Sequence, residues 1–306
     1  MNARLLLVVP AVLGALATAP NAVAYCVERT CGGVDADETC EYDEVGCVAT
    51  GANLHWVSSC LSFDVQVDGS LKSGIDADQA TEVTERAFAA WQKADCNGAH
   101  PSLKIGTFGA VACDESRYNE NGKNANVIVF RDDDWPYPGG QDTFGQTMVR
   151  FDTKTGEIYD ADVEINSFDF DVTTDGDADG ADLQSILTHE IGHFLGLAHT
   201  QSDEADATMR AGWDGHGVDL RTLTSDDEGG ICALYPPDRK ASESCEPRHG
   251  FSGQCFEPIP APAKPSCSST ARPVSSGVGR VALSGLVAVT LFRRRAARKP
   301  GAGRRR

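Results

Sequence analysis

The most constraining feature of the 306-residue sequence is the run H-E-I-G-H-F-L-G-L-A-H over residues 189–199. Residues i and i+4 of a helix lie about one turn apart on the same face, so His189 and His193 can direct two imidazoles toward one metal ion. Gly196 readily adopts the left-handed conformation that ends a helix, and a chain that turns there can bring His199 to the same ion. The run therefore predicts a helix that leads into a three-histidine metal site.

Three neutral imidazoles suit zinc, and catalytic zinc sites with three protein ligands keep one position for water. Glu190 lies where its carboxylate can reach that water rather than the ion. The sequence thus predicts one catalytic zinc held by His189, His193 and His199, with Glu190 as the general base that activates the zinc-bound water. Hydrolysis of a peptide bond is the expected reaction, although metal chemistry alone also allows a non-peptide amide or ester. An adhesive module that keeps a zinc fold without turnover is the other alternative, and the intact Glu190 argues against it.

Both helices and strands are predicted in a core that spans residues 61–237. Apolar residues at helical spacing predict helices over 76–93 and 182–198, and a capping box at Ser225–Glu228 predicts a short third helix. Alternating and β-rich runs predict strands over 61–67, 103–108, 126–130 and 147–151, the last paired as a hairpin with 157–166.

The start of the chain and the cysteines predict a secreted protein. Residues 1–24 combine a basic residue, an apolar stretch and Ala22-Val23-Ala24, which is typical of a secretory signal cut before Tyr25. The chain has 11 cysteines, and disulfides persist in oxidising compartments. Ten cysteines precede residue 256 and none of these is spaced as C-x-x-C, so up to five disulfides of unreadable connectivity are favoured over a cysteine zinc cluster.

Charge and composition indicate the partners and the outer segments. The net charge is −18, and the acidic surface this implies excludes nucleic acid as a favoured partner and suits a soluble extracellular or cell-surface monomer. Residues 25–60 predict a cysteine-rich extension, either structural or regulatory, and residues 238–273 a Pro/Ser-rich linker with a disulfide. Residues 274–306 are a tail with an apolar run too short to span a bilayer comfortably, followed by arginines.

The sequence resembles the metzincins, and within them the matrixins, the branch that contains the matrix metalloproteases. The resemblance rests on S-I-L-T-H-E-I-G-H-F-L-G-L-A-H-T at 185–200, the strand residues 160–164, Ala207-Thr208-Met209, and L-T-S-D-D-E-G-G-I-C-A-L-Y at 223–235. It implies a zinc endopeptidase with an α+β fold, in which two long helices and a short C-terminal helix accompany a twisted, mostly parallel five-stranded sheet.

The same resemblance assigns roles to further residues. Met209 would form the Met-turn beneath the histidines, and Asp226 and Asp227 would anchor the last helix to that turn and to the start of the chain. An extended polypeptide substrate would pair with an edge strand near residues 143–149. The tail, with Cys267, an apolar segment and an arginine cluster, resembles the C-terminal sorting signals of myxobacterial surface proteins; a chance apolar run explains it equally well.

Three features depart from the matrixin pattern. Only His55 and His100 precede the catalytic helix, so we expect no second, structural zinc. Residues 29–35 match the cysteine latency motif only in part, and we expect Cys31 to be disulfide-bonded instead. The Pro-x-Tyr wall of the specificity pocket is replaced by residues 210–213, Arg-Ala-Gly-Trp, which leaves that pocket undefined.

An acidic run, D-G-D-A-D-G at 175–180, resembles the first half of a calcium-binding loop. The candidate calcium ligands are Asp175, Asp177, Asp179 and Asp182, but the twelfth position of the loop is Ile186 instead of glutamate. An acidic loop that stabilises the following helix N-terminus explains the same pattern without an ion.

Overall fold

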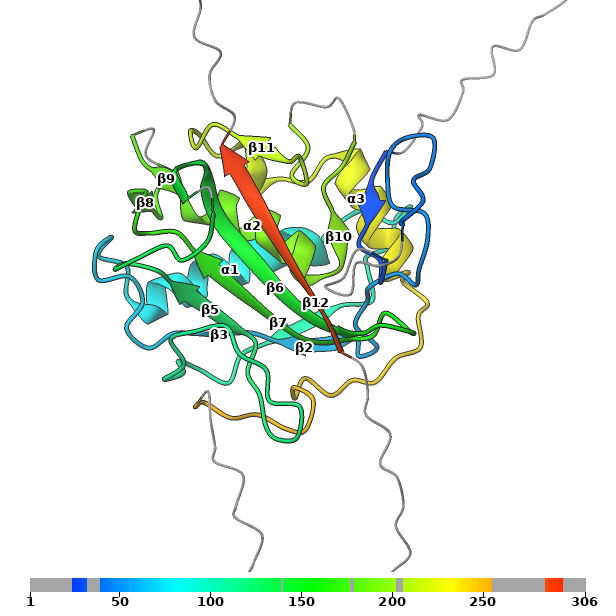
Figure 1. The fold of residues 1–306 in the computed structure, drawn as a ribbon, viewed down its shortest axis with the longest axis horizontal. Coiled ribbons are helices and arrows are strands. Elements are labelled where there is room, and N and C mark those ends of the chain that lie inside the picture. The colour runs from blue at the N-terminus through cyan, green and yellow to red at the C-terminus, as the bar shows by residue number, and fades with distance from the viewer. Residues whose placement is uncertain are drawn as a thin grey trace, which may run out of the picture.

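A computed structural model describes residues 24–31, 39–138, 140–176, 179–201, 206–254 and 284–293. The predicted signal up to residue 23, most of the linker, Asp177 and Cys267 lie outside these residues, as does much of the partial latency motif. Within the described residues the fold is α+β, with helices packed on a mixed sheet (Figure 1).

The central sheet has six strands in the order β11-β12-β6-β7-β5-β3. The pairs β3–β5, β5–β7 and β11–β12 are parallel, whereas β6–β7 and β12–β6 are antiparallel. The bounds are β3 Asp64–Val65, β5 Val127–Phe130, β6 Thr143–Asp152, β7 Ile158–Ile165, β11 Gly212–Trp213 and β12 Ser284–Arg293. The predicted hairpin is confirmed as β6 and β7. Strand β6 extends beyond its predicted range of 147–151, whereas β7 lies within the predicted range of 157–166.

The sheet differs from the five-stranded sheet that the resemblance implies. The predicted strand 61–67 is two short strands, β2 (Cys60–Ser62) and β3, because the chain changes its pairing partner at Phe63. Strand β2 pairs with β4 (Lys104–Gly106), and the Phe63 N–H still donates to Gly106 O at 3.1 Å, while β3 pairs with β5. At the opposite edge, β12 from the tail adds a strand beside β6.

Two long helices lie on one face of the sheet, behind the strands in Figure 1. Helix α1 (Ala77–Gln92) begins at a capping box between Asp76 and Gln79 and buries Val83, Phe88 and Trp91. The Trp91 Nε1–H donates to Thr188 O at 2.8 Å, which joins α1 to helix α2 (Leu183–Phe194). The predicted helix 76–93 is confirmed.

Helix α2 is shorter than the predicted span 182–198. It ends at Phe194, and Gly196 follows with φ +95°. Residues Leu197–Ala198 form strand β10, which pairs antiparallel with the N-terminal strand β1 (Cys26–Val27). The predicted bound at residue 198 is wrong because the helical spacing of apolar residues continues past the glycine. The prediction that Gly196 ends the helix in the left-handed conformation is confirmed.

The third helix, α3, spans Ser225–Leu234 and ends before Pro236 as predicted. Its capping box lies one residue earlier than expected. Thr224, rather than Ser225, is the N-cap, and Asp227 is its partner, with Oδ2 accepting from the Thr224 N–H at 2.8 Å. The remaining short elements are η1 Gly140–Asp142, η2 Asp219–Arg221, and the parallel pair β8 Val172–Thr173 and β9 Ala181–Asp182.

Disulfides connect the outer segments to the core. The bridges Cys26–Cys47 and Cys31–Cys40 lie in the cysteine-rich extension, so the prediction of a disulfide-bonded Cys31 is confirmed. Cys60–Cys245 joins the start of the core to the segment after it, and Cys96–Cys232 joins the end of α1 to α3. Cys113 is also disulfide-bonded.

The described part of the tail forms strand β12 along the outer edge of β6, from the pair Ser284 and Asp152 to the pair Phe292 and Thr143. In Figure 1 it is the red strand nearest the viewer, which runs along β6 and ends beside β11. Among the described residues, no helix has the length and apolar character needed to cross a membrane.

Candidate metal centre

Three histidines converge at the end of α2. His189 and His193 come from adjacent turns of the helix, and His199 comes from the segment just after β10. The Nε2 atoms are 3.1 Å apart for His189 and His193, 3.2 Å for His189 and His199, and 3.3 Å for His193 and His199. The structure therefore brings together all three predicted metal ligands.

The orientation of two imidazoles is set by backbone carbonyl groups. His189 Nδ1 lies 2.6 Å from Thr208 O, and His193 Nδ1 lies 2.8 Å from Leu197 O. A proton on each Nδ1 satisfies these contacts and leaves Nε2 as a lone-pair donor that faces the other histidines. Burial lowers the pKa of His189 to about 3, with His199 as the next cause, and burial lowers the pKa of His199 to about 4. All three imidazoles are thus neutral at neutral pH.

This geometry fits a zinc ion. Nitrogens bound to tetrahedral zinc at about 2.0–2.1 Å lie roughly 3.3–3.4 Å from one another, which is close to the observed separations. Three lone pairs directed at one point in a buried site repel one another unless a cation lies between them. Among the described residues, these histidines are the one group of three or more side chains arranged to hold a metal ion.

The end of α2 is held by two side chains that the sequence analysis did not identify. The Trp56 Nε1–H donates to Phe194 O at 2.8 Å, and the Tyr235 hydroxyl donates to Leu195 O at 2.7 Å. These bonds satisfy carbonyl groups that the helix leaves without an internal partner. At Gly196 a Cβ would lie 2.3 Å from Leu54 O, so a larger residue would prevent the turn that carries His199 into place.

Glu190 lies on the same helix and is fully buried. The Thr147 hydroxyl on β6 donates to Glu190 Oε2 at 2.7 Å. On the same strand, a Cβ at Gly145 would lie 3.1 Å from Glu190 Oε1, so the glycine leaves space for the carboxylate. Strand β6 therefore orients the predicted general base, a contact that the sequence analysis missed because the two residues lie 43 positions apart.

Met209 lies against α2, where a Cβ at Gly192 would come within 2.1 Å of its Sδ. Its position is set by α3, because Asp227 accepts from the Met209 N–H at 3.0 Å and from the Thr208 N–H at 2.9 Å. Asp226 accepts from the Thr200 hydroxyl at 2.6 Å and from the Ala24 N–H at 2.8 Å. The two acids thus connect the last helix with the segments around His199 and Met209 and with residue 24.

Comparison with known proteins agrees with this arrangement. The family model for matrixins matches residues 55–236, more than half of the chain. The chain belongs to the matrixin family. Matrixins use a catalytic zinc, and the three histidines lie within the matched region.

Two relatives of this matrixin are proteases by name. Matrilysin of Rattus norvegicus is 32% identical over 104 residues, which cover 34% of this chain and 35% of the relative. Metalloendoproteinase 1-MMP of Arabidopsis thaliana is 42% identical over 59 residues, covering 19% of this chain and 15% of the relative. The chain thus matches about a third or less of the length of these relatives.

The candidate calcium ligands are only partly described. Asp182 caps α2, where its Oδ2 accepts from the Ser185 N–H at 2.8 Å, and the same carboxylate pairs with Arg221. Asp175 and Asp179 are exposed, and Asp177 lies outside the described residues. Both oxygens of Asp182 therefore have protein partners, and calcium binding by these four residues stays a prediction.

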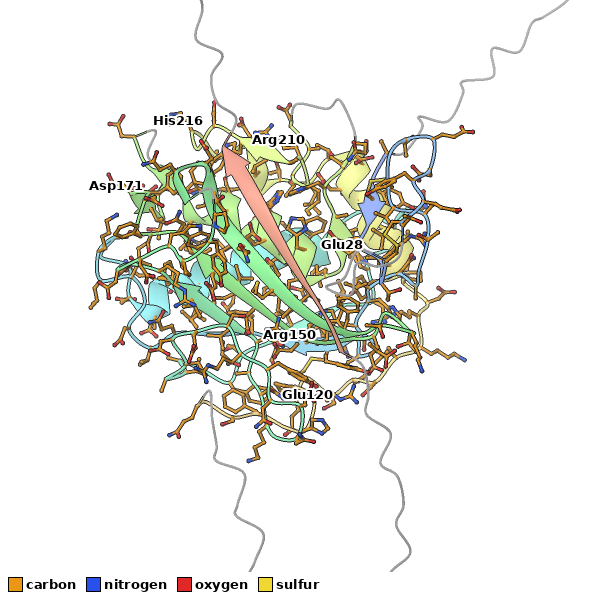
Figure 2. All side chains as sticks on the ribbon, viewed as in Figure 1. Glu28, Glu120, Arg150, Asp171, Arg210 and His216 are labelled. Atoms are coloured by element: carbon orange, nitrogen blue, oxygen red, sulfur yellow. A yellow bond between two sulfur atoms is a disulfide. The ribbon has the colours of Figure 1, made fainter. Side chains whose placement is uncertain are left out.

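In this matrixin, residues 210–213 replace the Pro-x-Tyr wall of the family pattern. Trp213 is the side chain that connects this segment to the core. Trp213 is buried and its ring lies 5.3 Å from the ring of Phe144 at the start of β6. Its Nε1–H donates to His216 O at 3.1 Å, in the loop that Figure 2 shows at the same end of the molecule as Arg210. The tryptophan thus connects the segment after Met209 with β6.

Proposed function

We propose that this matrixin is a secreted zinc endopeptidase of the metzincin type. The observation that carries the proposal is the buried convergence of His189, His193 and His199 beside an oriented Glu190. The disulfides and the composition of residues 1–24 support secretion. The sorting role of residues 274–306 and the monomeric state stay predictions.

A zinc ion held by the three histidines would supply Lewis acidity and lower the pKa of a coordinated water. Glu190 accepts the proton of the attacking water and passes it to the leaving amine, as a general base and then a general acid. The Thr147 hydroxyl donates to one carboxylate oxygen and so fixes the orientation of the carboxylate. Burial excludes bulk water from competing for this proton.

An extended polypeptide is the proposed substrate. Strand β6 supplies Thr147 and Gly145 to the catalytic carboxylate, so a peptide strand paired with the outer edge of β6 would pass close to the histidines. In this structure β12 lies on that edge. Strand β12 and a substrate would therefore compete for the same backbone N–H and C=O groups of β6.

Cleavage of denatured casein by the secreted protein tests the proposal. Wild type is compared with Glu190→Ala at equal zinc content, and with the exposed Glu120→Ala as a matched control on another part of the surface (Figure 2). Loss of a general base reduces rates by about 10²- to 10⁴-fold. We expect that loss in Glu190→Ala, full activity in Glu120→Ala, and inhibition of wild type by a zinc chelator.

Two results would contradict the proposal. One equivalent of zinc without cleavage of casein or of short peptides, even after removal of the tail, would favour a zinc-containing binding module. Chelator-sensitive hydrolysis of esters or small amides without cleavage of any polypeptide would assign the site to a different substrate class.

A further inference from the structure

The third metal ligand lies in a segment that α2 does not support. The helix ends at Phe194, and the next residues form β10 just before His199. Strand β1 of the cysteine-rich extension pairs with β10 through Cys26 opposite Ala198 and Val27 opposite Leu197. The Glu28 N–H also donates to Gly196 O at 2.9 Å. The backbone that leads into His199 is therefore held by residues of the N-terminal extension.

The same pairing supports the second ligand. His193 Nδ1 contacts the carbonyl oxygen of Leu197 at 2.8 Å, and Leu197 is the residue that Val27 opposes. A shift of β10 would thus change both the position of His199 and the acceptor that orients His193. His189 depends on a different segment, since its Nδ1 contacts Thr208 O.

A disulfide holds β1 in place. Cys26, within β1, is bonded to Cys47, and both residues are buried. The extension also contacts the chain beyond His199, because a Cβ on Gly46 would lie 3.6 Å from the Gln201 side chain. On the other side of β1, the Leu54 N–H donates to Glu28 O at 2.8 Å. In Figure 1 β1 is the dark blue strand beside α3 and the other described residues of the extension.

We propose that β1 and the Cys26–Cys47 disulfide act as a positioning element for the second and third zinc ligands. Groups that orient the ligands of a metal commonly change its affinity by about 10- to 100-fold when they are removed. In an oxidising compartment the disulfide keeps β10 in register and the zinc bound, whereas a chain without this bridge would release zinc faster. This inference rests on the proposed zinc site but does not depend on peptidase activity.

The first test compares two double variants that each remove one disulfide of the extension. Cys26→Ser with Cys47→Ser removes the bridge within β1, and Cys31→Ser with Cys40→Ser removes its neighbour, which has no residue in β1. Zinc-loaded proteins are mixed with a chromogenic chelator, and the rate of zinc release is recorded. We expect release about 10- to 100-fold faster for the first variant and unchanged release for the second.

A second pair of variants keeps every disulfide, in case the first does not fold. Glu28→Pro removes the N–H that bonds to Gly196 O, whereas Glu28→Ala keeps this N–H and removes only the side chain. Faster zinc release by Glu28→Pro than by Glu28→Ala is the expected result. The thermal midpoint of each metal-free protein is measured alongside, because a purely structural role would lower that midpoint without a specific effect on zinc.

The inference would be overturned if the two Glu28 variants released zinc at the same rate and the two disulfide variants did so as well. It would also be overturned if both disulfide variants released zinc faster than wild type by the same factor. These results leave zinc binding by wild type intact and so leave the proposed function standing. A wild-type protein that binds no zinc would overturn both. Wild type that binds zinc but cleaves nothing would overturn the proposed function alone.

Discussion

At the scale of single residues, one hydroxyl group orients the carboxylate of Glu190, the proposed general base. Thr147 lies on strand β6, outside the helix that carries Glu190, and its hydroxyl donates to Glu190 Oε2 at 2.7 Å. Thr147→Val keeps the side-chain volume but leaves that oxygen without this donor. Because a hydrogen bond to a charged group contributes about 1.5–3 kcal/mol, we expect kcat/KM for peptide cleavage to fall by about 10- to 100-fold.

Thr147→Ser is the matched control, since it restores the hydroxyl and should recover most of the activity. Zinc content should stay the same in all three proteins, because the Thr147 hydroxyl bonds to Glu190. If the Thr147→Val variant and the wild type had equal kcat/KM, strand β6 would not orient Glu190, the proposed general base.

At the scale of elements, α2 packs closely on the segment that carries Met209. A Cβ at Gly192 would lie 2.1 Å from Met209 Sδ and 2.9 Å from Trp91 Cζ2, so an alanine forces both neighbours to move. Overpacking of this kind costs about 1–3 kcal/mol. We expect Gly192→Ala to lower the free energy of unfolding by that amount, measured by denaturant titration of the metal-free protein.

Gly253→Ala is the control for this substitution, because its Cβ would meet only ordinary contacts of 3.7 Å or more. It should leave the free energy of unfolding nearly unchanged. Equal stability of the two alanine variants would mean that the close approach of Met209 to α2 is not maintained in solution.

The hairpin β6–β7 buries an acidic pair on one face. Asp160 and Asp162 are almost fully buried, and Asp160 is opposite Arg150, which Figure 2 shows at the end of β6 away from β11. Burial, and then the neighbouring Asp162, raise the pKa of Asp160 well above its usual value, and burial raises the pKa of Asp162 to about 7. The folded protein therefore retains protons that the unfolded chain releases above the ordinary pKa of aspartate.

Stability should consequently fall as pH rises from that ordinary pKa toward the folded pKa values, by at most about 1.4 kcal/mol per pH unit for each group. Asp160→Asn removes the free-energy cost of ionising a buried carboxyl group. We expect its thermal midpoint to exceed that of the wild type by more at pH 8 than at pH 5, with both proteins metal-free. The exposed Asp133→Asn is the control. A difference that does not grow with pH would show that Asp160 ionises normally.

At the scale of the whole molecule, β12 occupies the edge of β6 that we propose as the binding site of the substrate. Strand β12 pairs along the full length of β6 and then runs beside β11, on the side of the sheet that borders the metal centre. A chain that stops at residue 266 lacks this strand. We expect it to cleave casein faster than the full chain, with a lower KM, while zinc affinity stays the same.

Residual cleavage by the full chain should increase with mild warming if β12 detaches before the core unfolds. Identical KM values for the full and shortened chains would contradict competition for β6. A shortened chain that loses zinc or unfolds at a lower temperature would instead assign β12 a structural role.

The metal ligands were predictable because they are local in the chain. His189 and His193 are separated by one helical turn, and Gly196 ends the helix shortly before His199, so helix geometry alone places the histidines near one another. Helix α1 and the hairpin β6–β7 were predictable for the same reason. In each case the interactions that define the feature involve residues close in sequence.

The features that could not be predicted depend on contacts between distant residues. The pairing of Thr147 with Glu190, the Thr208 carbonyl group that orients His189, and the place of β12 all follow from how the elements pack. Residues 197–198 were assigned to the helix because apolar spacing continues past Gly196, whereas the pairing of β10 with β1 requires an extended chain there. Local spacing thus encodes which atoms can bind the metal, whereas long-range packing sets how those atoms are oriented and what reaches them.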